Sequence, residues 1–271
     1  MIDPFDNMPP FEPGWVWLTG AGPGNPGLVT LLGLHALRQA DVIIYDALVN
    51  PEILKFARDE AQTEYAGKRG GKPSPKQRDI SLRLIELARE NKRVLRLKGG
   101  DPFIFGRGGE EALSLVESNI PFRIVPGISA GIGGLAYAGI PVTHRDTNQT
   151  VTFITGHDSQ GQVPHGVDWA QIARGSQVLV IYMALKHAPQ ITRKLLDGGR
   201  RPDEPAAIVA DASLPNQQVV ETTLGKLSQA IEESSIAPPA IVVIGEVVRF
   251  RAALNWLEKA REAAVRNTGE G

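Results

Sequence analysis

Short apolar runs alternate along the chain with longer segments in which apolar residues recur at helical spacing. The segment 28–39, for example, carries leucines spaced as on one face of a helix. Such alternation is typical of α/β proteins with parallel strands. In the first half of the chain, the pattern predicts strands at 15–20, 41–45, 93–97 and 122–125, and helices at 28–39, 76–90 and 107–118.

The second half repeats the alternation in a different form. The pattern there predicts strands at 151–155, 177–182, 205–209, 218–222 and 240–245, and helices at 187–198, 225–233 and 250–265. Only a loop containing proline and asparagine separates the strands predicted at 205–209 and 218–222. Because so short a connection suits antiparallel neighbours, we expect a mixed sheet in this half.

A glycine-rich segment, 126–148, lies between the halves, and we expect it to form one closely packed helix and a turn. At about 150 residues per domain, 271 residues accommodate one large domain or two small ones, and the glycine-rich segment favours two. The expected fold class is therefore α/β, with two α/β domains. The expected parts are an N-terminal extension (1–14), an N-terminal domain (15–126), a connecting segment (127–149), a C-terminal domain (150–250), and a C-terminal helix and tail (251–271).

Composition excludes several kinds of chemistry. Cysteine is absent, which excludes disulfides, thiolate zinc sites, iron–sulfur clusters and cysteine nucleophiles. The net charge is −1, which argues against bulk binding to nucleic acid or to an anionic membrane surface. No run approaches the roughly 18–20 apolar residues of a membrane-spanning helix. The first 14 residues are proline-rich and acidic, unlike a signal peptide, so we expect a cytoplasmic protein.

The segment 19–27, TGAGPGNPG, follows a predicted strand and precedes a predicted helix. Glycines let backbone N–H groups approach an anion closely, and a helix N-terminus adds a positive dipole. Asp46, 24 residues after Gly22, completes a pattern that imitates a dinucleotide-binding fingerprint. Asn25 stands where that fingerprint has its third glycine, so a ligand loop and a purely structural turn are both open.

Two further segments concentrate charge and glycine. Residues 67–78 carry five basic side chains and no acidic one, which suits either a polyanionic ligand or a solvated loop. Residues 98–111, KGGDPFIFGRGGEE, follow a predicted strand, and ligands bind at such strand ends in α/β proteins. A structural loop does not need this density of special residues, which therefore favours a functional role.

Candidate polar residues also follow the glycine-rich segment. His144 is a candidate general base, although a single histidine more often has a structural role. Arg107 and Arg145 are candidate carboxylate clamps, because a guanidinium pairs bidentately with a carboxylate. His157 ends another predicted strand and equally suits a turn. We find no metal-ligand spacing, no hydrolase nucleophile elbow and no phosphate-binding loop motif.

Eight stretches together resemble the tetrapyrrole methylase family, in the family's order, from about Trp15 to Val248. They are GAGPGNPGLVTL, ADVIIYDALVNPEIL, GKRGG, RVLRLKGGDPFIFGRGGEEA, PFRIVPGISAGIGGLAYAGIPVTHRD, VTFITGH, LVIYMAL and AIVVIGEVV. The motifs GGDPFIFGRGGEE and YAGIPVTHRD are specific for the uroporphyrinogen-III subgroup of that family.

The resemblance implies a class III methyltransferase fold, with S-adenosyl-L-methionine bound in a cleft between two α/β domains, and a homodimer. It implies transfer of two methyl groups to C2 and C7 of uroporphyrinogen III, giving precorrin-2 via precorrin-1. Sirohaem, cobalamin and haem d1 synthesis all pass through that product. S-adenosyl-L-homocysteine would be the second product, and the resemblance implies no metal, nucleic acid or membrane.

The resemblance also implies site residues. Asp46 and Lys68 match positions proposed as acid/base residues, while Arg107, Glu110 and Arg145 match positions for substrate binding or catalysis. Cofactor contacts are implied at Pro23, Gly99, Gly100, Asp101, Ile104, Ser129, Ala130, Met183, Ala212 and Ala240. The sequence departs from the family at Asn25, at Ala47 and at Asp211-Ala212, where the family usually has aspartate, arginine and Asn-Gly.

The residues suit this chemistry. A sulfonium methyl group is already electrophilic, so the protein mainly aligns the reactants and removes a proton. A heavily carboxylated substrate also explains the local basic residues in a neutral chain. Three alternatives stay open: a methylase acting later on the corrin ring, an NAD-binding protein based on the glycine loop and Asp46, and a non-catalytic tetrapyrrole carrier.

Overall fold

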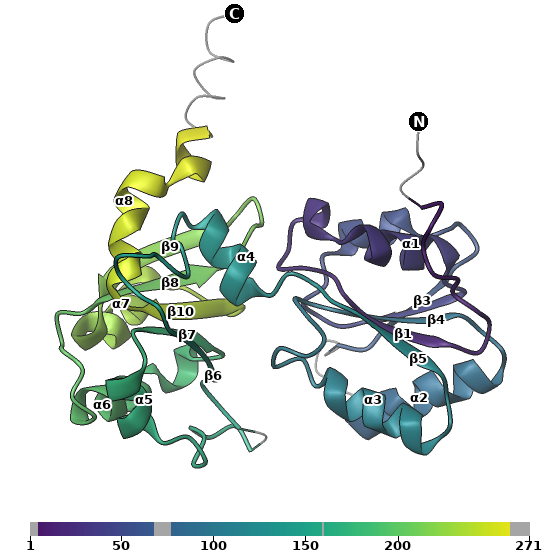
Figure 1. The fold of residues 1–271 in the computed structure, drawn as a ribbon, viewed down its shortest axis with the longest axis horizontal. Coiled ribbons are helices and arrows are strands. Elements are labelled where there is room, and N and C mark those ends of the chain that lie inside the picture. The colour runs from purple at the N-terminus through teal and green to yellow at the C-terminus, as the bar shows by residue number, and fades with distance from the viewer. Residues whose placement is uncertain (1–4, 68–76, 159, 261–271) are drawn as a thin grey trace, which may run out of the picture. The chain divides into compact units, whose positions relative to one another are not determined.

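The structure, a computed structural model, describes residues 5–67, 77–158 and 160–260. The chain divides into two compact units between Ser129 and Ala130, and each unit contains one five-stranded sheet (Figure 1). Within the described ranges, no helix is both long enough and apolar enough to cross a membrane.

The first sheet is entirely parallel, with strand order β3-β2-β4-β1-β5. The strands are β1 (Val16–Gly20), β2 (Val42–Tyr45), β3 (Gln62–Tyr65), β4 (Val94–Lys98) and β5 (Phe122–Val125). The helices of this unit are η1 (Pro26–Leu28), α1 (Leu31–Gln39), η2 (Pro51–Phe56), α2 (Gln77–Arg89) and α3 (Gly108–Glu117). Because all five strands point the same way, every loop that follows a strand begins at the same edge of the sheet.

Both faces of this sheet are covered, which explains why its central strands β1, β2 and β4 are mostly apolar. Leu37 of α1 packs with Trp17 and Leu95 on one face. Leu84 of α2 and Leu115 of α3 belong to a second cluster. Figure 1 shows α2 and α3 on the face of the sheet opposite to α1. The two apolar clusters anchor the strand ends that carry the candidate site.

Part of the predicted N-terminal extension belongs to this core. Phe11 is only 2% exposed, and its ring stacks on Trp17 with centroids 4.5 Å apart. The Nε of Arg93 donates a hydrogen bond of 2.7 Å to the Phe11 carbonyl. This packing could not be predicted from the sequence, because Phe11 is an isolated apolar residue among prolines and acidic residues.

The second sheet is mixed, as predicted, with strand order β6-β7-β10-β8-β9. Only β6 and β7 pair in parallel, and the other three pairs are antiparallel. The strands are β6 (Val151–Thr155), β7 (Val178–Tyr182), β8 (Pro205–Ala210), β9 (Gln218–Thr223) and β10 (Ala240–Ile244). The helices are α4 (Ala130–Tyr137), α5 (Trp169–Gly175), η3 (Leu185–His187), α6 (Ala188–Asp197), η4 (Leu224–Lys226), α7 (Leu227–Ser234), η5 (Glu246–Phe250) and α8 (Arg251–Leu254).

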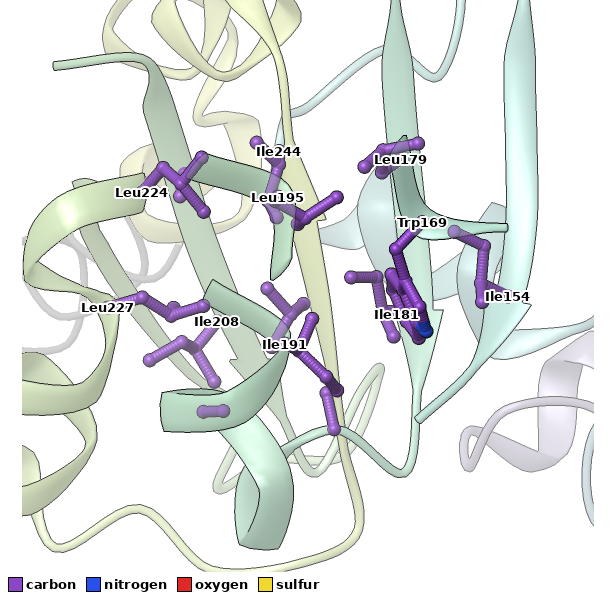
Figure 2. Packing of buried hydrophobic residues seen from close by; sticks show 14 of the residues in the cluster. Ile154, Trp169, Leu179, Ile181, Ile191, Leu195, Ile208, Leu224, Leu227 and Ile244 are labelled. Atoms are coloured by element: carbon purple, nitrogen blue, oxygen red, sulfur yellow. The ribbon is translucent and has the colours of Figure 1, made fainter. Parts of the chain in front are cut away.

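Apolar side chains cover both faces of this second sheet as well. Figure 2 shows one cluster, in which Ile191 and Leu195 of α6 face Ile208 and Ile244 of the sheet. On the other face, Leu135 of α4 packs in the same cluster as sheet residues such as Val180. The glycine-rich segment thus contributes the predicted helix, α4, to the core of the second unit.

Several elements differ from the sequence prediction. Strand β3 was not predicted, because its polar edge sequence QTEY has no apolar run. The short elements η2 and α5 were also missed. Helix α1 begins at Leu31 instead of 28, since Thr30 caps it by accepting a hydrogen bond from the Gly33 N–H at 3.0 Å.

The helix predicted at 250–265 is also interrupted. Helix α8 ends at Leu254, and helical structure resumes at 256–260. The rest of that predicted helix lies outside the described residues.

Candidate active site

Three loops meet at the carboxyl edge of the first sheet, after β1, β4 and β5. Gly22 and Gly100 exchange two backbone hydrogen bonds, of 3.2 Å from the Gly22 N–H and 2.8 Å from the Gly100 N–H. A Cβ at Gly20 would lie 2.5 Å from the Gly127 Cα, and one at Gly127 would overlap the Gly100 carbonyl oxygen. These glycines therefore allow the three backbones to touch each other.

The carboxylate of Asp101 ties two of these loops together. Its Oδ2 accepts from the Gly127 N–H at 2.9 Å, and its Oδ1 accepts from the Phe103 N–H at 2.8 Å. Ile104, which follows Phe103, has an apolar side chain and is 39% exposed. Asp101 thus has a structural role at this edge, and Ile104 offers an apolar surface there.

Two asparagine side chains, one inside the loop and one from the segment after β2, hold the loop that follows β1 in place. Asn25 caps η1 by accepting a 2.8 Å hydrogen bond from the Gly27 N–H. The amide of Asn50 donates to the Gly24 carbonyl at 2.9 Å. Pro23 lies within this loop, so Asn25 in place of a third glycine shapes the turn that carries Pro23.

Asp46 follows β2 at the same edge. Its Oδ1 accepts from the backbone N–H groups of Leu48 at 3.2 Å and Gly99 at 3.3 Å. Its Oδ2 lies 3.8 Å from an Nη of Arg96, and the Asp46 side chain is 27% exposed. The carboxylate is therefore held from one side by two N–H groups and a guanidinium, while a part of it reaches solvent.

A buried charged cluster lies behind Asp46. The Oε1 of Glu111 accepts from Arg96 Nε at 3.1 Å, from Lys98 Nζ at 3.1 Å and from Gln77 Nε2 at 2.8 Å. Burial, together with the charge of Arg96, lowers the pKa of Lys98. Sequence reasoning assigned no role to Arg96, Glu111 or Gln77. The sequence signal that could have found this cluster is the arginine inside an apolar strand, because a buried arginine needs a charged or polar partner.

Arg107 and Glu110 form a separate, exposed ion pair at the start of α3. Arg107 donates to the Glu110 carboxylate through Nε at 3.0 Å and through Nη2 at 2.6 Å. These hydrogen bonds raise the pKa of Arg107 and lower the pKa of Glu110. Arg107 also has a left-handed backbone, with φ of 61°. The structure thus presents a bidentate guanidinium next to the loop of Ile104.

The candidate cofactor residues of the second unit gather at one end of its sheet. Met183 follows β7, Ala212 follows β8, and Ala240 begins β10. These three positions share an end of the sheet because β10 runs antiparallel to both β7 and β8. Met183 has a left-handed backbone, with φ of 55°, and is 39% exposed.

Helix α4, which starts at Ala130, packs against this end of the second sheet. The Gly131 N–H donates to the Tyr182 hydroxyl at 2.8 Å. A Cβ at Gly134 would lie 2.7 Å from the Cβ of Ala212. The glycines of α4 therefore permit a close contact with the strand ends, and Tyr182 is a neighbour of the site that sequence reasoning missed.

The remaining predicted residues lie at separate places in the chain. Arg145 is exposed, in the turn that follows α4. The ring of His144 stacks on Phe250 at 4.2 Å, and its Nδ1 accepts from the Asp146 N–H at 3.3 Å, which favours the structural role. Ser129 is buried at the end of the first unit. Lys68 lies outside the described residues.

The structure therefore brings the predicted residues together in two sets. The set of the first unit surrounds the carboxyl edge of the parallel sheet, and that of the second unit surrounds the end of the mixed sheet next to α4. The cleft expected between the domains stays a prediction. Among the described residues, no group of three or more histidine, aspartate and glutamate side chains is placed to hold a metal ion.

A parallel sheet and a mixed sheet, with glycine loops and paired charges at the carboxyl edge of the first, define a two-unit α/β protein of the ligand-binding type. Residues 16–228 match the family described as Tetrapyrrole (Corrin/Porphyrin) Methylases, and the chain belongs to this family.

Curated relatives support this assignment. The chain is 66% identical over 258 residues to a uroporphyrinogen-III C-methyltransferase from Sinorhizobium sp, covering 95% of this chain and 92% of that protein. It is 49% identical over 243 residues to a siroheme synthase from Zymomonas mobilis subsp. mobilis, covering 90% of this chain. The match covers 51% of that synthase, so the chain spans about half the length of such relatives.

Solved structures show the same fold. A uroporphyrin-III C-methyl transferase from Thermus thermophilus, complexed with S-adenyl homocysteine, is 37% identical with a TM-score of 0.75. The match covers 86% of this chain and 98% of that one. A cobalt precorrin-4 methyltransferase is 25% identical with a TM-score of 0.76, covering 87% and 96% of the two chains.

Proposed function

We propose that this protein uses S-adenosyl-L-methionine to methylate uroporphyrinogen III at C2 and C7, giving precorrin-2 via precorrin-1. The observation that carries the proposal is the 66% identity, across nearly the full length of both chains, to a protein named for this activity. The Thermus thermophilus relative, complexed with S-adenyl homocysteine, supports the choice of methyl donor.

The residues at both sheet edges fit the donor. Ile104 and Met183 are half-exposed apolar side chains, which suit an adenine ring or a thioether chain. Ala130, Ala212 and Ala240 have small side chains, and Gly99 and Gly100 have none. These residues, with Pro23, Asp101 and Ser129, would hold the donor.

Asp46 is the proposed proton acceptor. When bound, S-adenosyl-L-methionine would supply an electrophilic methyl group and leave as S-adenosyl-L-homocysteine. After a pyrrole carbon has taken the methyl group, the macrocycle must lose a proton from another position, and Asp46 would accept that proton. Two N–H groups donate to Oδ1 and a guanidinium lies beside Oδ2, so the carboxylate is held in place at the sheet edge, where it can act as the proton acceptor. Lys68 is the proposed partner in proton transfer.

Arginines are the proposed clamps for the acidic macrocycle. Arg107 already binds one carboxylate bidentately, that of Glu110, and the pair is exposed. A substrate carboxylate can take the place of Glu110 with the same geometry. Arg145, which is also exposed, is the proposed second clamp. Neither guanidinium is a suitable general base, since it keeps its proton at neutral pH.

Methylation later on the corrin ring is the second candidate, favoured by the similarity to the cobalt precorrin-4 methyltransferase. The identity is 25% to that enzyme and 37% to the uroporphyrin-III enzyme, so the earlier substrate is the better supported one. Parallel assays with both substrates would separate the two functions.

The direct test is an anaerobic assay of the purified protein with uroporphyrinogen III and S-adenosyl-L-methionine. We expect mass spectrometry to show one and then two added methyl groups, with S-adenosyl-L-homocysteine formed in equal amount to the methyl groups transferred. Omission of the donor is the control. Methylation of corrin substrates alone, or binding of the macrocycle without turnover, would contradict the proposal.

A homodimer in the cytoplasm, without nucleic acid, membrane or metal, completes the proposal. Sedimentation analysis across a range of protein concentrations tests the dimer. Calorimetry with S-adenosyl-L-methionine and with NAD in parallel tests the cofactor, because only the first should bind.

A further inference from the structure

Asp46 is connected to Glu111 through a single buried side chain, that of Arg96. Arg96 is 2% exposed, and each nitrogen of its guanidinium has a polar neighbour. Nε donates to Glu111 at 3.1 Å, Nη1 donates to the carbonyls of Ile44 at 3.3 Å and Leu97 at 3.2 Å, and Nη2 lies 3.8 Å from Asp46. These contacts give the guanidinium one orientation, with one Nη directed at the Asp46 carboxylate.

We infer that Arg96 and Glu111 are positioning residues for Asp46, with Glu111 orienting Arg96 and Arg96 holding the Asp46 carboxylate in place. The inference rests on the proposed function, in which Asp46 accepts the proton. Neither residue touches the reacting atoms in this scheme, because both lie behind Asp46 inside the first unit.

The energetics of burial support a role beyond stability. Glu111 is fully buried, and within the described residues its Oε2 has no hydrogen-bond partner. Removing an arginine, a lysine and a glutamate from water is costly, and well-packed apolar residues are often at least as stable in such positions. The neighbouring positions on β4, Val94, Leu95 and Leu97, are apolar. The charged side chains of β4 are therefore confined to Arg96 and Lys98, which both contact Glu111.

Several charged and titratable groups lie on the elements around Asp46. Strand β4 contributes Arg96 and Lys98, and α3 contributes Glu111. On β3, the Tyr65 hydroxyl lies against Gly67, beside Ala47, which follows Asp46. Among these, Arg96 is the cation with a direct contact to Asp46, and Glu111 is the anion that opposes the effect of Arg96.

Opposite signs of charge predict opposite effects on the pH dependence of methylation. Arg96→Gln removes the cation beside Asp46, so the acidic limb of the kcat/KM profile should move to higher pH. Glu111→Gln removes the opposing anion, so the limb should move to lower pH. For charges at this separation in a partly solvated site, we expect each limb to move by about one pH unit. In the double variant Arg96→Gln/Glu111→Gln, the two shifts should largely cancel.

A second readout needs no substrate. In protein labelled with ¹³C at aspartate carboxyl groups, the Asp46 signal, assigned with Asp46→Asn, should titrate with a midpoint displaced in the same two directions. The control is Arg200→Gln, which breaks another buried pair, Arg200–Glu204 at 3.1 Å, in the second unit. That variant should lose stability without moving the limb or the midpoint.

The outcomes separate the inference from the proposed function. If both single variants lower only the free energy of unfolding, as Arg200→Gln does, the cluster is structural and the inference is wrong. If the wild-type protein fails to methylate uroporphyrinogen III but the midpoints move in opposite directions, the coupling to Asp46 stands and the proposed function is wrong. If a single variant fails to fold, the double variant, which keeps the net charge, and Arg96→Lys supply the comparison. If Arg96→Lys preserves the Asp46 midpoint but the double variant displaces it by more than one pH unit, the two shifts do not cancel and the inference is contradicted.

Discussion

Gly20 and Gly127, 107 positions apart in the chain, lie so close that a Cβ on Gly20 would stand 2.5 Å from the Gly127 Cα. The two glycines lie at the ends of neighbouring parallel strands, because Gly20 is the last residue of β1 and Gly127 lies just beyond β5. The Gly100 carbonyl is the third group at this point. The loops that carry the proposed donor site are therefore in direct backbone contact.

Gly127→Ala should disrupt this contact. The new Cβ would overlap the backbone carbonyl of Gly100, which cannot rotate away, so we expect a loss of about 1–3 kcal/mol in the free energy of unfolding and weaker donor binding. Urea denaturation and calorimetry with S-adenosyl-L-methionine measure the two effects. Gly109→Ala, on α3 with open space around it, is the control and should change stability by less than about 1 kcal/mol. Equal effects of the two substitutions would contradict the close-approach argument.

Asp46→Asn should lower turnover while leaving donor affinity nearly unchanged. Asparagine keeps an oxygen that can accept from the Leu48 and Gly99 N–H groups, so the loop should retain its geometry. Loss of a general base typically lowers rates by about 10²–10⁴-fold. Single-turnover kinetics and calorimetry provide the comparison. Full activity of the variant would remove Asp46 from the mechanism.

Arg107→Ala should weaken substrate binding more than donor binding. A charge-assisted, bidentate interaction of this kind corresponds to about a 10- to 100-fold increase in KM for the macrocycle. Stability should change little, because the Arg107–Glu110 pair is exposed. Arg107→Lys, which keeps the charge but not the fork, should fall between the two proteins. A parallel loss of donor affinity would place Arg107 on the donor side instead.

The stability of the protein should depend on Lys98 at alkaline pH. Burial lowers the native pKa of Lys98 below its ordinary value of 10.5, so between the two values the unfolded chain binds a proton that the native protein does not. Stability therefore rises with pH through that window, and the contribution of Lys98 is least favourable below it.

Lys98→Met removes this dependence. The difference in unfolding free energy, wild type minus variant, should increase with pH by up to about 1.4 kcal/mol per unit within the window. Denaturation series from pH 7 to the alkaline range measure it. A difference that stays flat or falls as pH rises would show that Lys98 keeps its proton in the native protein.

Phe11→Ala tests the packing of the N-terminal segment. Phe11 is fully enclosed against Trp17, so its removal should lower the free energy of unfolding by about 3–5 kcal/mol. Leu82→Ala, at a half-exposed position on α2, is the control and should cost about 1 kcal/mol or less. If the two variants were equally stable, residues 5–14 would be dispensable for the fold.

Local patterns were sufficient for most of the strands. A central parallel strand is buried on both faces, so β1, β2 and β4 appear in the sequence as mostly apolar runs, although β4 also contains Arg96 and Lys98. An edge strand has no such requirement, which is why β3, with two exposed polar residues, could not be predicted. Asp46 and Arg107 could be predicted as candidate site residues because they stand in distinctive motifs, Asp46 directly after a strand and Arg107 directly before a helix.

The sequence by itself determined the two α/β halves, the mixed second sheet, the family and the loops that hold most candidate residues, since each depends on neighbours within a few positions. Only the tertiary structure decided that Glu111 joins Arg96 and Lys98 behind Asp46, that Phe11 enters the core, and that Gly20 meets Gly127. Those contacts join residues brought together by strand order and by the face that each helix turns inward. No periodicity along the chain encodes such pairings, because they arise only when separate elements pack.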